Sequence, residues 1–264
     1  ETSVSGSLLV TGTAGNLVVL ESTNPGTQWA LNPTSDQSVD FAGVQDGDVT
    51  APTGIVITAN DSTNVGNNDT TDGGDGDGAW FFAVATSHTW QGGAVGQETV
   101  WTEPTNWDTG VVPSTGHDVT IPNQANDPVL PAGGVTLGNL TIQAGGLLTT
   151  NGEPLTLLDN VVLDGSIDAG ASTITVQGDW TAAGTATFTA GTSTVVFTGT
   201  AAQSLTTGGS SFANLTVNKS SGIVTAVTNA VTATGALSVS SGTLDVDTND
   251  LAVTAGSLSV NGTF

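Results

Sequence analysis

The chain lacks cysteine, methionine and tyrosine, and Lys219 is its single lysine or arginine in 264 residues. Without cysteine, a disulfide framework and a thiolate metal site are both excluded. Opposite the one lysine stand 24 aspartates and glutamates, so the formal net charge is -23 at pH 7. Because almost nothing in the chain neutralises phosphate groups, this composition excludes nucleic acid as a partner and disfavours an anionic membrane surface.

Long apolar runs are also missing, and no stretch approaches the roughly 20 apolar residues of a transmembrane helix. Aromatic residues make up 5 % of the chain, whereas there are 36 glycines. Glycine and β-branched residues recur every few positions, which disfavours long helices. No signal peptide opens the sequence, so a secreted or cell-surface location is an expectation from composition. The composition predicts an all-β protein built from thin, regularly stacked strands.

A seven-residue repeat near the C-terminus is the strongest pattern. Its leucines are Leu237, Leu244, Leu251 and Leu258, and a valine follows two residues behind each. Spacing of i, i+2 is the period of a strand and not of a coiled coil. The seventh positions hold Gly235, Gly242, Asn249 and Gly256, which permit the positive φ of a tight turn. Each unit predicts a short strand with Leu and Val inward, and three units per turn predict a coil of about 21 residues.

The same unit occurs earlier, in NLTIQAG (139–145) and GLLTTNG (146–152), where Leu140 and Leu147 are seven apart. Looser copies lie at 172–178, 192–199 and 212–220. The stretch 178–222, GDWTAAGTATFTAGTSTVVFTG and onward, resembles the Thr/Gly-rich repeats of large bacterial secreted, adhesin-like surface proteins. That resemblance implies a right-handed parallel β-helix. Residues 101–130 resemble a segment that leads into such a helix, and residues 16–82 resemble the closing part of a preceding repeat block.

We therefore expect three parts. A short β block over residues 1–85 ends in an Asp/Gly-rich loop, a Trp-rich cap segment covers 86–130, and β-helix repeats cover 131–264. The expected fold class is all-β, a parallel β-helix (solenoid) preceded by a short β block. For that first block an immunoglobulin-like β-sandwich is the alternative.

The Asp/Gly-rich loop (60–78) is a candidate calcium site. Its candidate ligands, with glycines around them, are Asp69, Asp72, Asp75 and Asp77. Ca²⁺ prefers carboxylate and carbonyl oxygens on a flexible backbone. The segment partly resembles the Ca²⁺ repeat G-G-x-G-x-D, but Gly78 stands where the pattern has Asp, and the motif occurs once. A solvated loop without metal is the alternative interpretation.

Three tryptophans, Trp90, Trp101 and Trp107, lie close together in the cap segment. Exposed aromatic rings stack on sugars, so these residues are candidate contacts to a glycan. Large apolar side chains also close the end of a β-helix core. Both interpretations stay open on the sequence alone, and the core plug is the favoured one.

Evidence for catalysis is weak. His88 and His117 lie in no metal-binding motif, and Ser114, three residues before His117, lies in a Pro-Ser-Thr-Gly turn and not in a GxSxG elbow. β-Helix enzymes that cleave acidic polysaccharides use Arg or Lys against the substrate, and this chain has no Arg. Asp245 and Asp247 share one outward face but are adequately explained as solvent-facing residues. We predict that the protein is not an enzyme.

Both ends of the sequence lie within the repeat pattern, at ETSVSGSLLV and at SLSVNGTF. An uncapped coil is a template for pairing, so we expect head-to-tail assembly of the chain with itself into an extracellular fibre or surface appendage. An excised fragment of a longer chain has the same appearance. The alternatives are an adhesive or carbohydrate-binding surface module, and a β-sandwich pilin that exchanges a strand.

Overall fold

The computed structural model describes residues 2–4, 8–11, 18–24, 26–40, 42–51, 55–60, 63–66, 68, 70, 79–83 and 86–264. The chain divides into two compact units: residues 1–85 with 109–111, and residues 86–108 with 112–264. Together they hold about 10 turns of parallel β-solenoid. The described residues contain no α-helix and a single 3₁₀ turn, η1 (Pro104–Asn106). The predicted all-β solenoid is confirmed.

The first unit contains three parallel sheets of three strands each. The first is formed by β1 (Thr2–Val4), β3 (Trp29–Pro33) and β6 (Gly47–Val49). The second is formed by β2 (Val18–Leu20), β5 (Ala42–Gln45) and β8 (Thr63–Gly66). The third is formed by β4 (Gln37–Asp40), β7 (Val56–Asn60) and β9 (Ala79–Ala83).

Pairing in the first unit rules out the sandwich alternative. Strands that lie next to each other are separated by about one coil of chain, as in the pairing of Val39 with Ala59, and all of them run parallel. An immunoglobulin-like sandwich is built from antiparallel strands. The described strands of residues 1–85 therefore form a parallel solenoid and not an immunoglobulin-like β-sandwich. The core of the unit contains the buried Leu31, Val44, Ile57 and Trp80.

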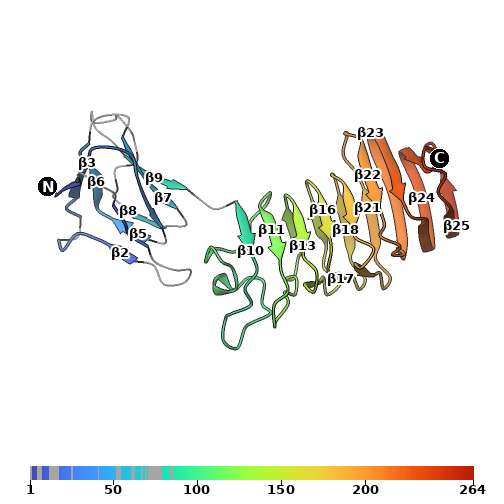
Figure 1. Ribbon diagram of the computed structural model, residues 1–264, viewed down its shortest axis with the longest axis horizontal. Helices are drawn as coiled ribbons and strands as arrows, with labels where there is room; N and C mark the ends of the chain where they lie inside the picture. Colours follow the sequence, from blue (N-terminus) through green and yellow to red (C-terminus); the bar gives the residue numbers. More distant parts are fainter. Residues whose placement is uncertain are drawn as a thin grey trace. The chain divides into compact units, whose positions relative to one another are not determined.

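The second unit stacks its strands along three faces of one coil (Figure 1). The first stack is β10 (Ser87–Thr89), β11 (Asp118–Ile121), β13 (Leu140–Ile142), β16 (Val161–Leu163), β19 (Trp180–Ala182) and β22 (Gln203–Thr206). The second stack is β12 (Val135–Leu137), β15 (Leu155–Leu157), β18 (Thr173–Val176) and β21 (Thr194–Phe197). The third stack is β14 (Leu147–Thr149), β17 (Ser166–Asp168) and β20 (Thr187–Thr189).

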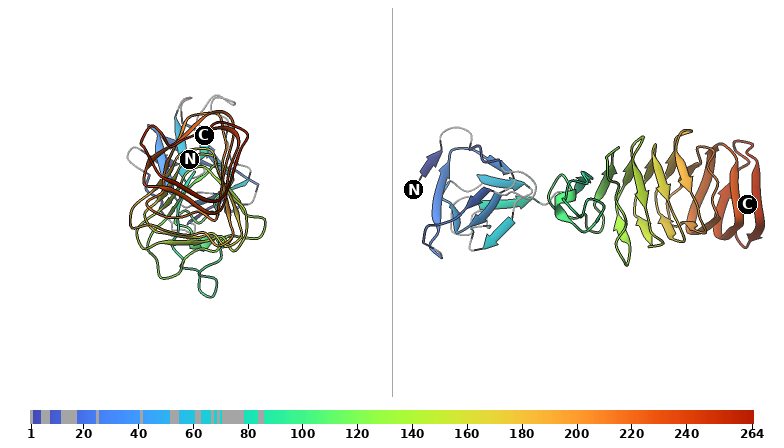
Figure 2. Two further views of the ribbon diagram at one scale, coloured as in Figure 1. Left: turned by 90° about the vertical axis from the view of Figure 1, so that its right-hand side faces the viewer. Right: turned by 90° about the horizontal axis from the view of Figure 1, so that it is seen from below.

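The last coils of the second unit use longer strands that continue around the corners. These are β23 (Asn214–Thr228), β24 (Val231–Asp245) and β25 (Val253–Val260). Because β23 pairs with both β21 and β22, it joins the first and second stacks into one 13-stranded sheet. Viewed along the stack, the coils of this unit overlie one another (Figure 2).

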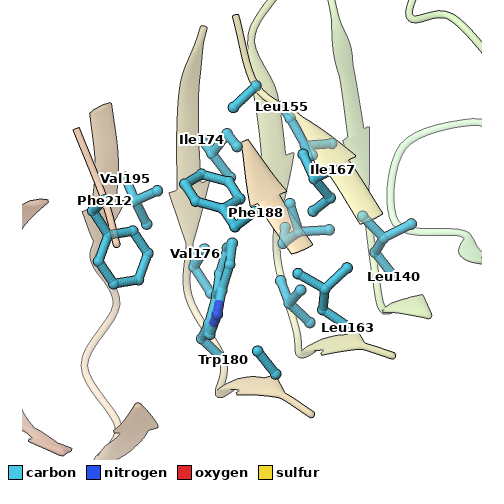
Figure 3. Packing of buried hydrophobic residues seen from close by; sticks show 14 of the residues in the cluster. Leu140, Leu155, Leu163, Ile167, Ile174, Val176, Trp180, Phe188, Val195 and Phe212 are labelled. Carbon is cyan, nitrogen blue, oxygen red and sulfur yellow. The ribbon is translucent and has the colours of Figure 1, made fainter. Parts of the chain in front are cut away.

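The strand register confirms the predicted coil length. Leu237 pairs with Leu258, so three seven-residue units complete one turn of 21 residues. The first turn of the second unit, where Ser87 pairs with Asp118, is longer, and the later turns range from 19 to 25 residues, as shown by the pairs Leu155 with Ile174 and Trp180 with Leu205. Inward side chains therefore lie directly above one another in successive coils and fill the interior with Leu, Val, Ile and a few aromatic rings (Figure 3).

Two details of the repeat differ from the prediction. Leu140 is buried as expected, but in the next unit Leu148 and not Leu147 points inward, pairing with Ile167. Two adjacent leucines satisfy the heptad pattern equally well, and the register decides between them. Leu251 is half-buried and precedes β25 instead of opening a strand of its own.

The corner glycines have two different functions. Gly242 has the predicted positive φ, at 80°. At Gly235 the reason is space, because a Cβ would lie 2.7 Å from Oδ1 of Asn214 in the preceding coil. A Cβ at Gly256 would likewise lie 2.6 Å from a backbone carbonyl oxygen. Asn249 donates its side-chain amide to a carbonyl oxygen of the previous coil at 2.8 Å. The close stacking of coils thus explains the glycines at corners where the turn itself does not require a positive φ.

One corner carries a ladder of polar side chains from coil to coil. Oδ1 of Asp118 accepts from Asn139, Oδ1 of Asn139 accepts from Asn160, and Oδ1 of Asn160 accepts from the backbone of Asp179. Asp179 in turn accepts from the backbone N–H of Ser204 at 2.7 Å. These bonds satisfy corner N–H groups that have no partner in the strand ladders.

Candidate functional site

The tryptophan cluster, Trp90, Trp101 and Trp107, lies inside the core at the β10 end of the second unit. All three side chains are at most 1 % exposed. Trp107 packs edge-on against Trp90 and Trp101, with ring centroids 4.9 and 4.7 Å apart. The indole nitrogens of Trp90 and Trp107 donate to backbone carbonyl oxygens at 2.7 and 2.8 Å. A sugar-stacking platform needs an exposed ring face, and this cluster has none, so its geometry is that of a core plug.

Buried Asn106 holds the loop that covers this cluster. Its side-chain amide donates to the carbonyl oxygens of Gln97 and Val100, at 2.7 and 3.0 Å, and its Oδ1 accepts from Ala94 at 2.8 Å. The loop is therefore fixed by hydrogen bonds from a single side chain in its centre.

The candidate calcium ligands, Asp69, Asp72, Asp75 and Asp77, lie outside the described residues. Among the residues that the structure does describe, no group of three or more His, Asp or Glu side chains is arranged to hold a metal ion. Calcium binding by the 60–78 loop stays a prediction.

The Asp245 and Asp247 pair shows no acid–base arrangement. Asp245 accepts from the backbone N–H and the hydroxyl of Thr248, at 3.0 and 2.6 Å. These hydrogen bonds from Thr248 hold the pKa of the Asp245 carboxyl below its usual value. Asp245 therefore caps the turn that contains Thr248.

Lys219 is buried in the interior of the second unit and is 1 % exposed. Its Nζ donates to the carbonyl oxygen of Thr198 at 3.1 Å and to Oε1 of Gln203, which is itself buried. Both acceptors are neutral oxygens. Desolvation by burial lowers the pKa of the ammonium group, because the charged form is the one that loses hydration.

The last coil presents an apolar face. Leu258 and Val260 occupy the inward positions that Leu237 and Val239 occupy one coil earlier. Leu237 and Val239 are fully buried, whereas Leu258 and Val260 are 54 % and 41 % exposed, and nearby Phe264 is 46 % exposed. Beside them lies a groove of about 290 Å³ lined mainly by Ile223, Leu244, Val246, Thr263 and Phe264.

A line of three polar side chains crosses the first two rungs of the second unit. Oγ of Ser114 lies 2.9 Å from Nε2 of His117, and Nδ1 of His117 lies 2.8 Å from Nε2 of His88. The two imidazole planes differ by 7° with centroids 5.0 Å apart. Since 2.8 Å is too short for stacked rings, the two rings share an in-plane hydrogen bond. We call this arrangement the Ser114–His117–His88 relay.

The relay runs from solvent to core. Ser114 is exposed, His117 is half-buried, and His88 is fully buried with its ring edge-on to Trp107 at 6.3 Å. Pairing of β10 with β11 brings the two histidines together although they are 29 residues apart. The sequence places Ser114 near His117, but the contact to His88 depends on a register that no local pattern specifies.

Comparisons of the chain with protein-family models, curated proteins and solved structures return no match. Among the described residues, no helix is long and apolar enough to cross a membrane. The parallel β-solenoid is thus established by the structure itself, and any functional conclusion depends on the geometry described above.

Proposed function

We propose that the protein is a structural segment of an extracellular fibre or surface appendage and that copies of it assemble head to tail. The observation that carries this proposal is the equivalence of successive coils. Leu215, Leu237 and Leu258 lie above one another in consecutive turns, so each coil is a fitting surface for the next. A further coil of the same kind covers the apolar face of the last coil with the same contacts.

The energetics of apolar burial support this assignment. The exposed Leu258, Val260 and Phe264 leave apolar area in water, and burying it is favourable by roughly 25 cal/mol per Å². Among the strands that the structure describes, β25 pairs with β24 alone, and its other edge can accept a further parallel strand. We commit to a second copy of this chain as the occupant of that edge. The formal net charge of -23 repels one copy from another, and the burial of apolar area at the end face has to outweigh that repulsion.

The test compares two substitutions on one strand. Leu258 points inward toward the stacking face, whereas neighbouring Ser259 points outward. Leu258→Asp and Ser259→Asp add the same charge, one residue apart. Electron microscopy and sedimentation should show filaments for the unaltered chain and Ser259→Asp, and single subunits for Leu258→Asp. Equal behaviour of the two variants, or monodisperse single subunits of the unaltered chain at all concentrations, would refute end-to-end stacking.

A carbohydrate-binding role has lost its main support, since the tryptophan cluster is buried. Binding of the unassembled chain to a glycan array would revive that alternative and would count against a purely structural role.

A further inference from the structure

We propose that Ser114 is an activated nucleophile that accepts acyl groups from small, uncharged or cationic esters. The observation behind this is the Ser114–His117–His88 relay, and the inference is independent of the fibre proposal. A nucleophilic serine needs a base within hydrogen-bond reach and a further group that orients that base. Both distances, 2.9 and 2.8 Å, lie within that reach.

Protons can occupy this relay in two ways. In the first arrangement, Nε2–H of His88 and the backbone N–H of Ser114 both point to Nδ1 of His117, the backbone nitrogen from 3.4 Å away. Nε2–H of His117 then donates to Oγ of Ser114. In the other, Nδ1–H donates to Nε2 of His88, and Nε2 accepts the proton of the serine hydroxyl. The second arrangement prepares Oγ for attack. The two arrangements differ in the tautomer of both imidazole rings. Passing from the first to the second also releases the original hydroxyl proton of Ser114, places a proton on Nδ1 of His88 and gives up the backbone N–H bond from Ser114 to Nδ1 of His117.

Ser114 borders a space that could hold a substrate. The residue lines a groove of about 480 Å³ whose other walls are Pro113, Thr115, Gly133, Gly134, Val135, Thr136, Pro154 and Thr156. The adjacent backbone N–H of Thr115 has no hydrogen-bond partner in the described part of the chain, so it is available to a carbonyl oxygen of a bound ester.

The charge of the protein selects among substrates. With a formal net charge of -23, the chain repels anions and attracts cations over most of its surface. The lack of arginine argues against acidic polysaccharides as substrates. The residues that line the groove include no basic side chain that would bind an anionic ligand. Small acyl esters of neutral or positively charged alcohols suit the groove lining, and the negative charge of the protein does not repel them.

The reaction balances without a cofactor. Oγ of Ser114 attacks the ester carbonyl carbon while its proton moves to Nε2 of His117. The bond from carbon to the alcohol oxygen breaks, and the alcohol leaves with that proton. Water then attacks the acyl-serine, gives a proton to the same nitrogen, and releases the acid as the proton returns to Oγ.

The test is covalent labelling of the full chain with a fluorophosphonate, which forms an Oγ–P bond as fluoride leaves. Peptide mapping of the unaltered protein should place the label on Ser114. Ser114→Ala should abolish labelling, and the matched control Ser221→Ala, at an exposed serine hydroxyl far from the groove, should not change it. His117→Gln should slow labelling about 100-fold or more, the usual contribution of a general base.

His88 is a positioning residue, and its test separates orientation from folding. His88→Gln keeps an acceptor near the place of Nε2, whereas His88→Leu fills the space without one. If both variants keep the circular dichroism of the parent, His88→Gln should label faster, and the pH profile of labelling should change only in His88→Leu. Labelling of Ser114 no faster than of other exposed hydroxyls, or an unchanged rate in His117→Gln, would overturn the proposal.

Discussion

Raising the pH through the alkaline range to about 11 should stabilise this protein, because the buried Lys219 loses its charge at a lower pH in the folded chain than in the unfolded chain. Burial lowers the pKa of the Lys219 ammonium group in the folded chain, whereas in the unfolded chain the group titrates near ~10.4. Between these two pKa values the unfolded chain binds more protons, so the free energy of unfolding rises with pH. The slope is at most about 1.4 kcal/mol per pH unit, and the gain ends once both states are neutral.

The composition makes this measurement clean. The chain has no tyrosine, cysteine or arginine and no second lysine, so no other side chain titrates in that window. Urea unfolding at constant ionic strength, in half-unit steps of pH, should give a rising midpoint for the parent and a flat one for Lys219→Met. Parallel curves for the two proteins would mean that the ammonium group is not desolvated, and the described environment of Lys219 would then be wrong.

Three further predictions follow from the packing. Leu148→Ala should destabilise the protein by about 2–5 kcal/mol, and Leu147→Ala should cost clearly less, which unfolding curves can check directly. Gly235→Ala should cost about 1–3 kcal/mol because its Cβ meets the preceding coil, whereas Gly184→Ala, with nothing within 4 Å, should stay within about 0.5 kcal/mol. Acrylamide should quench the fluorescence of the tryptophan cluster poorly, and strong quenching would contradict its burial.

The repeat could be predicted from sequence because its signal is local. The alternation of Leu and Val with small polar residues predicts which side chains face the core. The seven-residue spacing of Leu237 and Leu244, taken three times, predicts the coil length that separates Leu237 from Leu258. Adjacent Leu147 and Leu148 defeat the same logic, since a shift of one residue exchanges the two faces of a strand. Only pairing with the neighbouring coil resolves that choice.

The candidate sites were harder to predict because they depend on contacts between coils. The relay needs His88 and His117 in adjacent rungs, and their separation in the chain is longer than the regular coil. Lys219 has polar neighbours in the sequence, Asn218 and Ser220, so a solvent-facing position is the natural expectation for it. Lys219 nevertheless continues the alternation of the buried Leu215 and Val217 along β23, and so it points inward.

The coil length has a mechanical consequence. A turn of 21 residues, as between Leu237 and Leu258, advances the stack by one strand spacing, about 4.8 Å. The same residues pulled straight span about 70 Å. Because each coil is bonded only to its neighbours, a coil can peel from the stack without opening the rest. Under tension the stack would therefore lengthen in steps of one coil. Each step shortens the folded stack by one strand spacing and adds more than ten times that length of extended chain.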